Sequence, residues 1–243
     1  MRNIKLSLEY DGTNYCGWQI QPNGVTIQGV LTEFLNRLEG KPVTLHGAGR
    51  TDAGVHALNQ IASFFTEKTL PCHKLRRAIN GNLPLDIRVT EVEEMPLDFH
   101  ARFSAKGKSY SYQLAVGEIV SPFEYRYFYH YPCNLDLEKM QLGANLLLGT
   151  HDFSAFATQP ETNSCVRTVT SISLTQKQDK IVFQVEGNGF LRYMVRTIVG
   201  TLLEVGRGKI VPENISNILA SGERSKAGAT APACGLTLLK VNY

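Results

Sequence analysis

The sequence lacks the features that would place the chain in a membrane, in a disulfide-forming compartment or around a metal ion. Its longest apolar stretches are about half of the roughly 20 residues that a membrane span needs, and its first residues contain no signal-peptide core. The five cysteines form no CxxC pair and, being odd in number, cannot all join in disulfides. The six histidines include no HxxxH pair. We therefore expect a cytoplasmic protein without a metal.

An excess of one charge is also missing. The chain has 25 Lys and Arg against 22 Asp and Glu, a formal net charge of +3, which excludes a polybasic tail protein. With 43% hydrophobic and 19% charged residues, the composition is typical of a folded globular protein. A length of 243 residues fits one large domain or two small ones, each able to bury a core.

The first part of the chain alternates between strand and helix patterns. Thr26 can cap a helix whose apolar residues recur every three to four positions until Gly40 and Pro42 end it. A short basic helix is predicted over 73–83, closed by glycine and proline. Period-two or apolar patterns predict strands over 4–10, 43–46, 60–65 and 87–92. This gives the order βαββαβ.

The second part repeats that order loosely. The patterns predict strands over 108–116, 125–131, 168–175, 181–186 and 236–241, and helices over 137–148, 190–206 and 212–220. Each half thus resembles a ferredoxin-like unit, an arrangement also used by RNA-recognition modules. We predict an α+β fold of two ferredoxin-like or RRM-like halves, 1–104 and 105–243, with antiparallel mixed sheets that form a central cleft.

The most unusual stretch is the loop at residues 47–57. It places three glycines, Arg50, Asp52 and His56 between two apolar strands. Glycine permits positive φ or close approach to a ligand, so the loop could present Arg50 and Asp52 outward. It fits neither GxGxxG nor a Walker loop. A plain connecting turn, in which the Asp bonds its own backbone, explains the same composition equally well.

The string GRTDAGVHA at 49–57 closely resembles the active-site motif of the tRNA pseudouridine synthase A family. Similar strings follow in the expected order along nearly the whole chain: Tyr10-Asp11-Gly12 with Gly17-Trp18-Gln19, 99–105, 108–112, 189–196 with Val199-Gly200, and Gly235-Leu236. The resemblance implies the pseudouridine synthase fold and an isomerase that converts uridine to pseudouridine at positions 38, 39 and 40 in the anticodon stem-loop of tRNA. It implies a homodimer and no cofactor.

The resemblance also implies roles for four residues. Asp52 is the nucleophile and Arg50 helps to extrude the base. Tyr110 packs on the target uracil, and Arg196 pairs with Asp52. The first half would then carry the catalytic Asp loop, and the second half the Tyr and Arg of the site.

Elementary chemistry agrees with these roles. A carboxylate can attack either C1′ or C6, and the sequence does not choose between them. A nearby guanidinium would keep a buried carboxylate ionised. Flipping a uridine costs a few kcal/mol, and stacking on an aromatic ring returns about 1–3 kcal/mol.

Structural explanations remain open for the same side chains. Tyr110 and Tyr112 share a strand face, so at least one of them packs in the core. On a helix starting at 190, Arg192 and Arg196 would lie about 40° apart beside an apolar stripe, where arginines often only reach toward water.

Positive charge gathers in three segments despite the small total. The residues expected to contact RNA are Arg76, Arg77, Arg102, Lys108 and Arg192, although surface solvation explains any one of them as well. Residues 86–98 hold five acids and one arginine, which suggests an acidic rear surface.

Two other functions fit parts of the pattern. A non-catalytic RNA-binding module could be built from paired RRM-like units, but it would gain nothing from an acid in the loop. A glycosidase would need a second carboxylate beside Asp52, and no motif supplies one.

Overall fold

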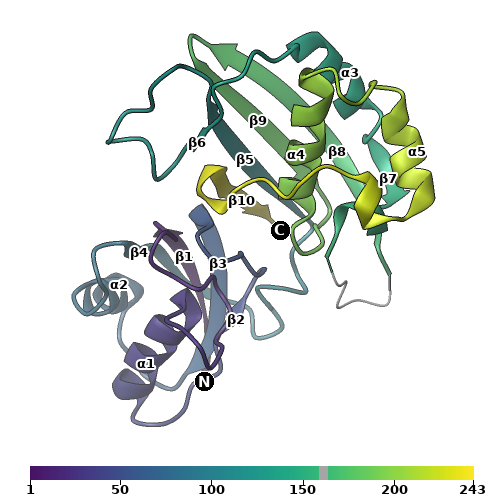
Figure 1. Cartoon of the computed structure of the whole chain (residues 1–243). Helices are drawn as coiled ribbons and strands as arrows, with labels where there is room; N and C mark the ends of the chain where they lie inside the picture. The colour runs from purple at the N-terminus through teal and green to yellow at the C-terminus, as the bar shows by residue number, and fades with distance from the viewer. Residues whose placement is uncertain (159–163) are drawn as a thin grey trace. The chain divides into compact units, whose positions relative to one another are not determined.

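The structure is a computed structural model that describes residues 1–158 and 164–243 (Figure 1). The chain divides into two compact units, Met1–Lys106 with Thr237–Tyr243, and Gly107–Leu236. The sequence placed the division after residue 104 and the last strand in the second half. The structure groups residues 237–243 with the first unit because they pair with a strand of that unit.

The first unit is built on a sheet centred on β1 (Arg2–Tyr10) and β3 (His56–Thr66), which pair antiparallel. β4 (Ile87–Met95) pairs antiparallel with the other side of β1. The two-residue strand β2 (His46–Gly47) pairs antiparallel with β3, and the start of β3 pairs parallel with β10 (Leu236–Asn242). The chain order β1-α1-β2-β3-α2-β4 matches the predicted βαββαβ unit.

Helices α1 (Ile27–Glu39) and α2 (Cys72–Asn80) connect these strands. The Thr26 side chain accepts a hydrogen bond from the Gly29 N–H, and Gly40 ends α1 with a φ of 70°. Both ends of α1 were therefore predicted correctly. Its apolar side, Ile27, Leu31 and Leu35, is fully buried, which is the period-3.6 stripe expected of a helix on a sheet.

The sheet of the second unit has the order β5 (Gly107–Ala115), β9 (Lys180–Gly187), β8 (Val166–Lys177) and β7 (Gly149–Asp152). All three pairings are antiparallel, and the two-residue β6 (Tyr129–His130) pairs parallel with the end of β5. Helices α3 (Leu137–Asn145) and α4 (Met194–Gly206) pack against each other and on this sheet, and α5 (Asn214–Ser221) follows (Figure 1). The α+β class is thus confirmed.

Three single-turn 3₁₀ helices complete the elements of the described residues. They are η1 (Ser154–Phe156), η2 (Arg224–Lys226) and η3 (Ala233–Gly235). Neither these turns nor β7 was predicted from the sequence. They are too short to show a hydrophobic period.

Two predicted strands are largely wrong. Residues 122–127 form turns, and only Tyr129–His130 of the predicted strand 125–131 is a strand. The side chains there do not alternate between core and solvent, since Tyr125, Arg126 and Tyr127 are exposed in succession. Of the strand predicted over 43–46, only His46 belongs to a strand.

The helix predicted from residue 190 begins instead at Met194. Tyr193 precedes it with a φ of 62°, a left-handed conformation that cannot lie inside a right-handed helix. Arg192 is therefore not on the helix that carries Arg196, and the predicted angle of about 40° between them is wrong.

Candidate active site

Asp52 lies in the loop at 48–55 that joins β2 to β3 in the first unit. Its side chain is half-buried, and Arg50 is exposed. The Val55 N–H donates to the Asp52 carbonyl at 3.1 Å, and Gly54 has a φ of 77°. A tight turn therefore begins at Asp52, and it needs glycine at position 54.

The N-terminal segment braces this loop on both sides of Asp52. The Trp18 N–H donates to the Thr51 carbonyl at 3.0 Å, just before Asp52. The Gly54 N–H donates to the Tyr15 carbonyl at 3.2 Å, just after it. The loop is thus fixed to residues 15–18 at Thr51 and at Gly54, on either side of Asp52, which limits the freedom of the carboxylate.

Buried polar side chains add a second support. The hydroxyls of Tyr10 and Thr51 lie 2.8 Å apart, and both residues are buried. The Gln60 side-chain amide, fully buried, donates to the Gly49 carbonyl at 3.0 Å. Burial raises the pKa of Tyr10 to about 12, so the hydroxyl stays protonated at neutral pH.

Two glycines of the N-terminal motif allow the close approach. A Cβ on Gly12 would lie 2.0 Å from the Val55 carbonyl oxygen, and one on Gly17 would lie 2.5 Å from that of Thr51. Gly17 also has a φ of +86°. The motif that includes Gly12 and Gly17 is therefore explained by backbone-to-backbone packing against the Asp52 loop.

Sequence reasoning did not single out Thr51 or Gln60. A signal was available for Gln60, because it is a polar residue inside an otherwise apolar strand, and a polar side chain there must find a buried partner. Thr51 gave no such signal, since its partner Tyr10 is far away in the sequence.

Tyr110 and Tyr112 project from β5 in the second unit. Tyr110 is buried, and its ring meets the Phe190 ring edge-on with centroids 5.3 Å apart. The Tyr112 hydroxyl donates to the Pro232 carbonyl at 2.8 Å, and its ring is fully buried. Tyr112 is therefore a packing residue, which fits the expectation that one of the two tyrosines belongs to the core.

Arg196 is half-buried near the start of α4. Its Nε donates to the Ala231 carbonyl at 2.7 Å, and the Ala231 N–H donates to the Arg196 carbonyl at 3.1 Å. The guanidinium carbon lies 5.1 Å from the centre of the Tyr193 ring, and that of Arg192 lies 4.9 Å from the same ring. The backbone and the guanidinium of Arg196 are thus both held within its own unit.

A sequence model of the family described as "tRNA pseudouridine synthase" matches residues 7–104 and 144–243. The chain belongs to this family. It is 49% identical to "tRNA pseudouridine synthase A" of Acetivibrio thermocellus and 47% identical to the protein of that name from Solibacter usitatus, each over the full length of both chains. The predicted resemblance is therefore confirmed, and with it the prediction of an isomerase that forms pseudouridine in tRNA.

A solved structure is similar only distantly. A chain of a Cbf5-Nop10-Gar1 complex superposes with a TM-score of 0.40 and 11% identity, over 97% of this chain and 48% of that chain. This family member therefore spans about half the length of the chain that it matches there.

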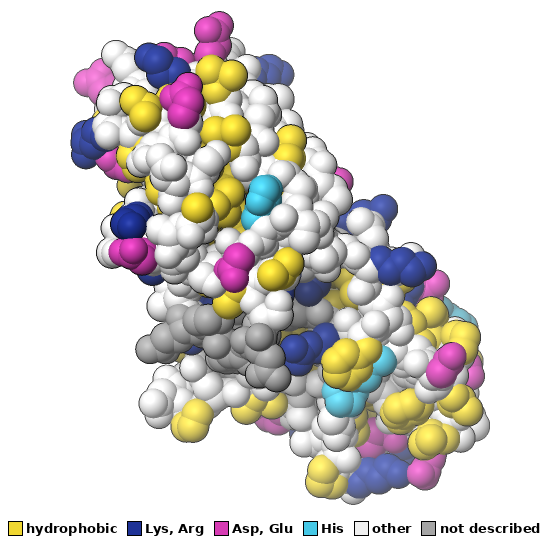
Figure 2. All heavy atoms as spheres, turned by 90° about the vertical axis from the view of Figure 1, so that its right-hand side faces the viewer, with side chains coloured by type: hydrophobic (Ala, Val, Ile, Leu, Met, Phe, Trp, Pro, Cys, Tyr) yellow, Lys and Arg dark blue, Asp and Glu magenta, His cyan; other side chains and the backbone are white. Residues whose placement is uncertain are grey.

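The side chains predicted to contact RNA occupy both units. Arg76, Arg77, Arg102 and Arg192 are exposed, whereas Lys108 on β5 is half-buried. Arg76 donates to the Thr90 carbonyl at 2.9 Å, so part of its guanidinium is used within its own unit. Figure 2 shows basic side chains beside hydrophobic and histidine side chains on the face that it presents.

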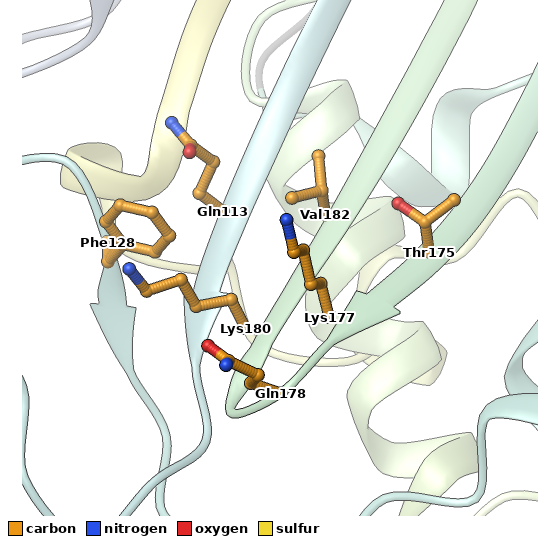
Figure 3. A pocket seen from close by; sticks show the side chains of 7 residues that line it. All are labelled: Gln113, Phe128, Thr175, Lys177, Gln178, Lys180 and Val182. Carbon is orange, nitrogen blue, oxygen red and sulfur yellow. The ribbon is translucent and has the colours of Figure 1, made fainter.

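A cavity of about 350 Å³ lies in the second unit, at the hairpin that joins β8 to β9. Lys177, Gln178 and Lys180 of the hairpin, with Gln113, line it beside apolar atoms (Figure 3). Lys180 forms an ion pair with Glu124 and lies 5.1 Å from the centre of the Phe128 ring. No residue predicted for the active site lines this cavity.

Within 1–158 and 164–243, no group of three or more His, Cys, Asp or Glu side chains could hold a metal ion. In the same residues, no helix has the length and apolar character needed to cross a membrane.

Proposed function

We propose that this family member isomerises uridine to pseudouridine at positions 38, 39 and 40 in the anticodon stem-loop of tRNA. The observation that carries the proposal is the support of the Asp52 loop, which is hydrogen-bonded to residues 15–18 at Thr51 and at Gly54, on either side of Asp52. A carboxylate held this way is preorganised for attack, and positioning is among the largest contributions to catalysis.

The reaction conserves atoms and electrons. The bond from ribose C1′ to uracil N1 breaks, the base turns, and a bond from C1′ to C5 forms. C5 loses a proton and N1 gains one, so the product is an isomer and no oxidant is needed. The Asp52 carboxylate serves as the nucleophile that forms and then releases a covalent intermediate.

Three further residues have assigned roles in the proposal. Arg50, exposed in the loop, helps to extrude the uridine. Tyr110 packs on the flipped uracil, and its edge-on contact with Phe190 holds the ring in place. Arg196 pairs with Asp52 and keeps it ionised, and the Nε bond to the Ala231 carbonyl fixes the orientation of its guanidinium.

The proposal includes contacts of Arg76, Arg77, Arg102, Lys108 and Arg192 with the RNA backbone. It also includes a homodimer in the cytoplasm. Sedimentation equilibrium of the purified chain tests the dimer, for which the expected mass is twice the 27.0 kDa of one chain. A mass of one chain across the micromolar range would contradict it.

The decisive experiment is incubation of unmodified tRNA with the protein, followed by mapping of pseudouridine. We expect product at positions 38 to 40, none with Asp52→Ala, and unchanged tRNA affinity in that variant. Tight binding without product from the wild type would support the non-catalytic RNA-binding module instead. Product elsewhere in the tRNA would refute the site assignment alone.

A further inference from the structure

Phe103 is the most exposed aromatic side chain of the first unit among the described residues, with 77% of its surface accessible. A single exposed phenyl ring is ordinary. The rings behind it make this one unusual: its centroid lies 4.4 Å from that of His100 with the planes at 34°, and the His100 ring lies 4.5 Å from that of His46 at 40°. Three rings thus form a short stack that ends in solvent.

The turn that presents Phe103 is rigidly held. The Nδ1 of His100 accepts hydrogen bonds from the backbone N–H groups of Arg102 at 3.0 Å and Phe103 at 3.3 Å. The Ser104 N–H donates to the His100 carbonyl at 2.9 Å, and the His100 N–H donates to the Ser104 hydroxyl at 3.0 Å. Burial lowers the pKa of His100, which keeps Nδ1 an acceptor at neutral pH.

The turn is also fixed to the strands beside the Asp52 loop. Ala101 is fully buried, its N–H donates to the Ser63 hydroxyl at 3.1 Å, and its carbonyl accepts from the Tyr243 hydroxyl at 2.7 Å. Ser63 is the register partner of His46, which lies six residues before Asp52. The ring stack and the Asp52 loop therefore share one support, the pairing of β2 with β3.

A cation completes the surface. The Arg102 guanidinium lies 5.7 Å from the centre of the Phe103 ring. An aromatic face next to an exposed guanidinium matches a nucleotide, in which a flat base adjoins a phosphate.

We propose that Phe103, backed by His100 and His46, is a stacking platform for an unpaired base of the RNA substrate, with Arg102 on the adjoining phosphate. The base is a different one from the uridine that reacts, because the proposed function already assigns that uracil to Tyr110. The inference rests on the proposed function, since it adds a second base contact to the same substrate.

The test measures the affinity of the full-length protein for fluorescently labelled tRNA. Loss of one base stack predicts a roughly 5- to 150-fold weaker Kd for Phe103→Ala. Phe103→Leu should bind like the alanine variant, because it keeps apolar volume but has no π face, and Phe103→Trp should bind like wild type. Phe123→Ala, which removes a ring that is 89% exposed in the other unit, is the matched control and should bind normally.

A second measurement identifies the base. In a series of tRNAs, each with one abasic site at an unpaired position, a single RNA should bind wild type and Phe103→Ala equally. The inference is overturned if no RNA in the series binds the two proteins equally. It is also overturned if Phe103→Leu binds tRNA like wild type. A Phe103→Ala protein with normal tRNA affinity but altered oligomeric mass would show a contact between copies instead.

The outcomes separate this inference from the proposed function. If wild type forms pseudouridine and Phe103→Ala binds tRNA normally, only the platform is refuted. If wild type binds tRNA through Phe103 but forms no pseudouridine, the platform stands and the catalytic proposal fails.

Discussion

Replacing Gly17 by alanine should slow pseudouridine formation about 100-fold while leaving tRNA affinity near normal. The added Cβ would lie 2.5 Å from the Thr51 carbonyl oxygen, and ordinary contact begins at 3.4 Å. The loop next to Asp52 must therefore move by about 0.9 Å. A displacement of about 1 Å at reacting groups costs on the order of 100-fold in rate.

The same substitution also strains the backbone. A residue with a Cβ at the φ of +86° found at Gly17 costs roughly 1–2 kcal/mol of folding free energy. This cost must be separated from the displacement of the loop. Gly40 provides the control, because its φ is +70° but a Cβ there would meet nothing within 4 Å. Gly40→Ala should lose similar stability and keep its full rate.

The assay is single-turnover conversion of tRNA that carries tritium at uridine C5. The tritium is released when C5 joins C1′, so its release reports the isomerisation itself, and saturating enzyme removes any effect of affinity. Urea unfolding of both variants gives the matched stability change.

Two results would refute the reasoning. A Gly17→Ala protein whose rate stays within two-fold of wild type would show that the loop tolerates the shift. Equal rate losses in Gly17→Ala and Gly40→Ala would show that general destabilisation, and not the displaced loop, is the cause.

Further predictions concern three other residues. Burial raises the pKa of Tyr10 from 10.0 to about 12, so the folded state favours the protonated hydroxyl. The resulting contribution to the free energy of unfolding is fully present below pH 10 and is lost as the pH rises toward 12, at about 1.4 kcal/mol per pH unit. Tyr10→Phe should abolish that part of the slope in urea unfolding between pH 9 and 12; an unchanged slope would contradict it. Arg196→Lys loses the Nε bond to Ala231 and the planar fork, so kcat should fall at least ten-fold with normal tRNA affinity, and a normal kcat would exclude the pairing. Gly200→Ala puts a Cβ 1.7 Å from the Ala229 carbonyl oxygen, so Tm should fall by at least several degrees in calorimetry; an unchanged Tm would refute this packing.

Helix α1 could be predicted because several local signals agree. Thr26 caps it, the apolar positions follow the helical period, and Gly40 ends it in the left-handed conformation. None of these signals depends on residues far away in the sequence. The start of α4 was missed because Tyr193 adopts positive φ although residues 190–194 contain neither glycine nor proline to signal a break.

The candidate site shows the same limit. The motif around Asp52 was found by resemblance, but its support by Tyr10, Tyr15 and Trp18 depends on contacts between distant parts of the chain. The aromatic residues around 125 give the pattern of a strand, yet Tyr125 faces solvent. Composition alone cannot distinguish an aromatic residue in the core from one held out for a partner.

The pairing of β10 with β3 has a consequence for synthesis on the ribosome. Thr237 pairs with His56, and the Lys106 N–H donates to the Asn242 carbonyl at 2.8 Å, so residues translated after the whole second unit complete the first unit. At about 5–20 residues per second, residue 243 follows residue 106 by about 7–27 s. During that interval the nascent strand that follows the Asp52 loop has an open edge at His56. A chain that stops before residue 237 never closes that edge, so the first unit is finished only after all of the second unit has been translated.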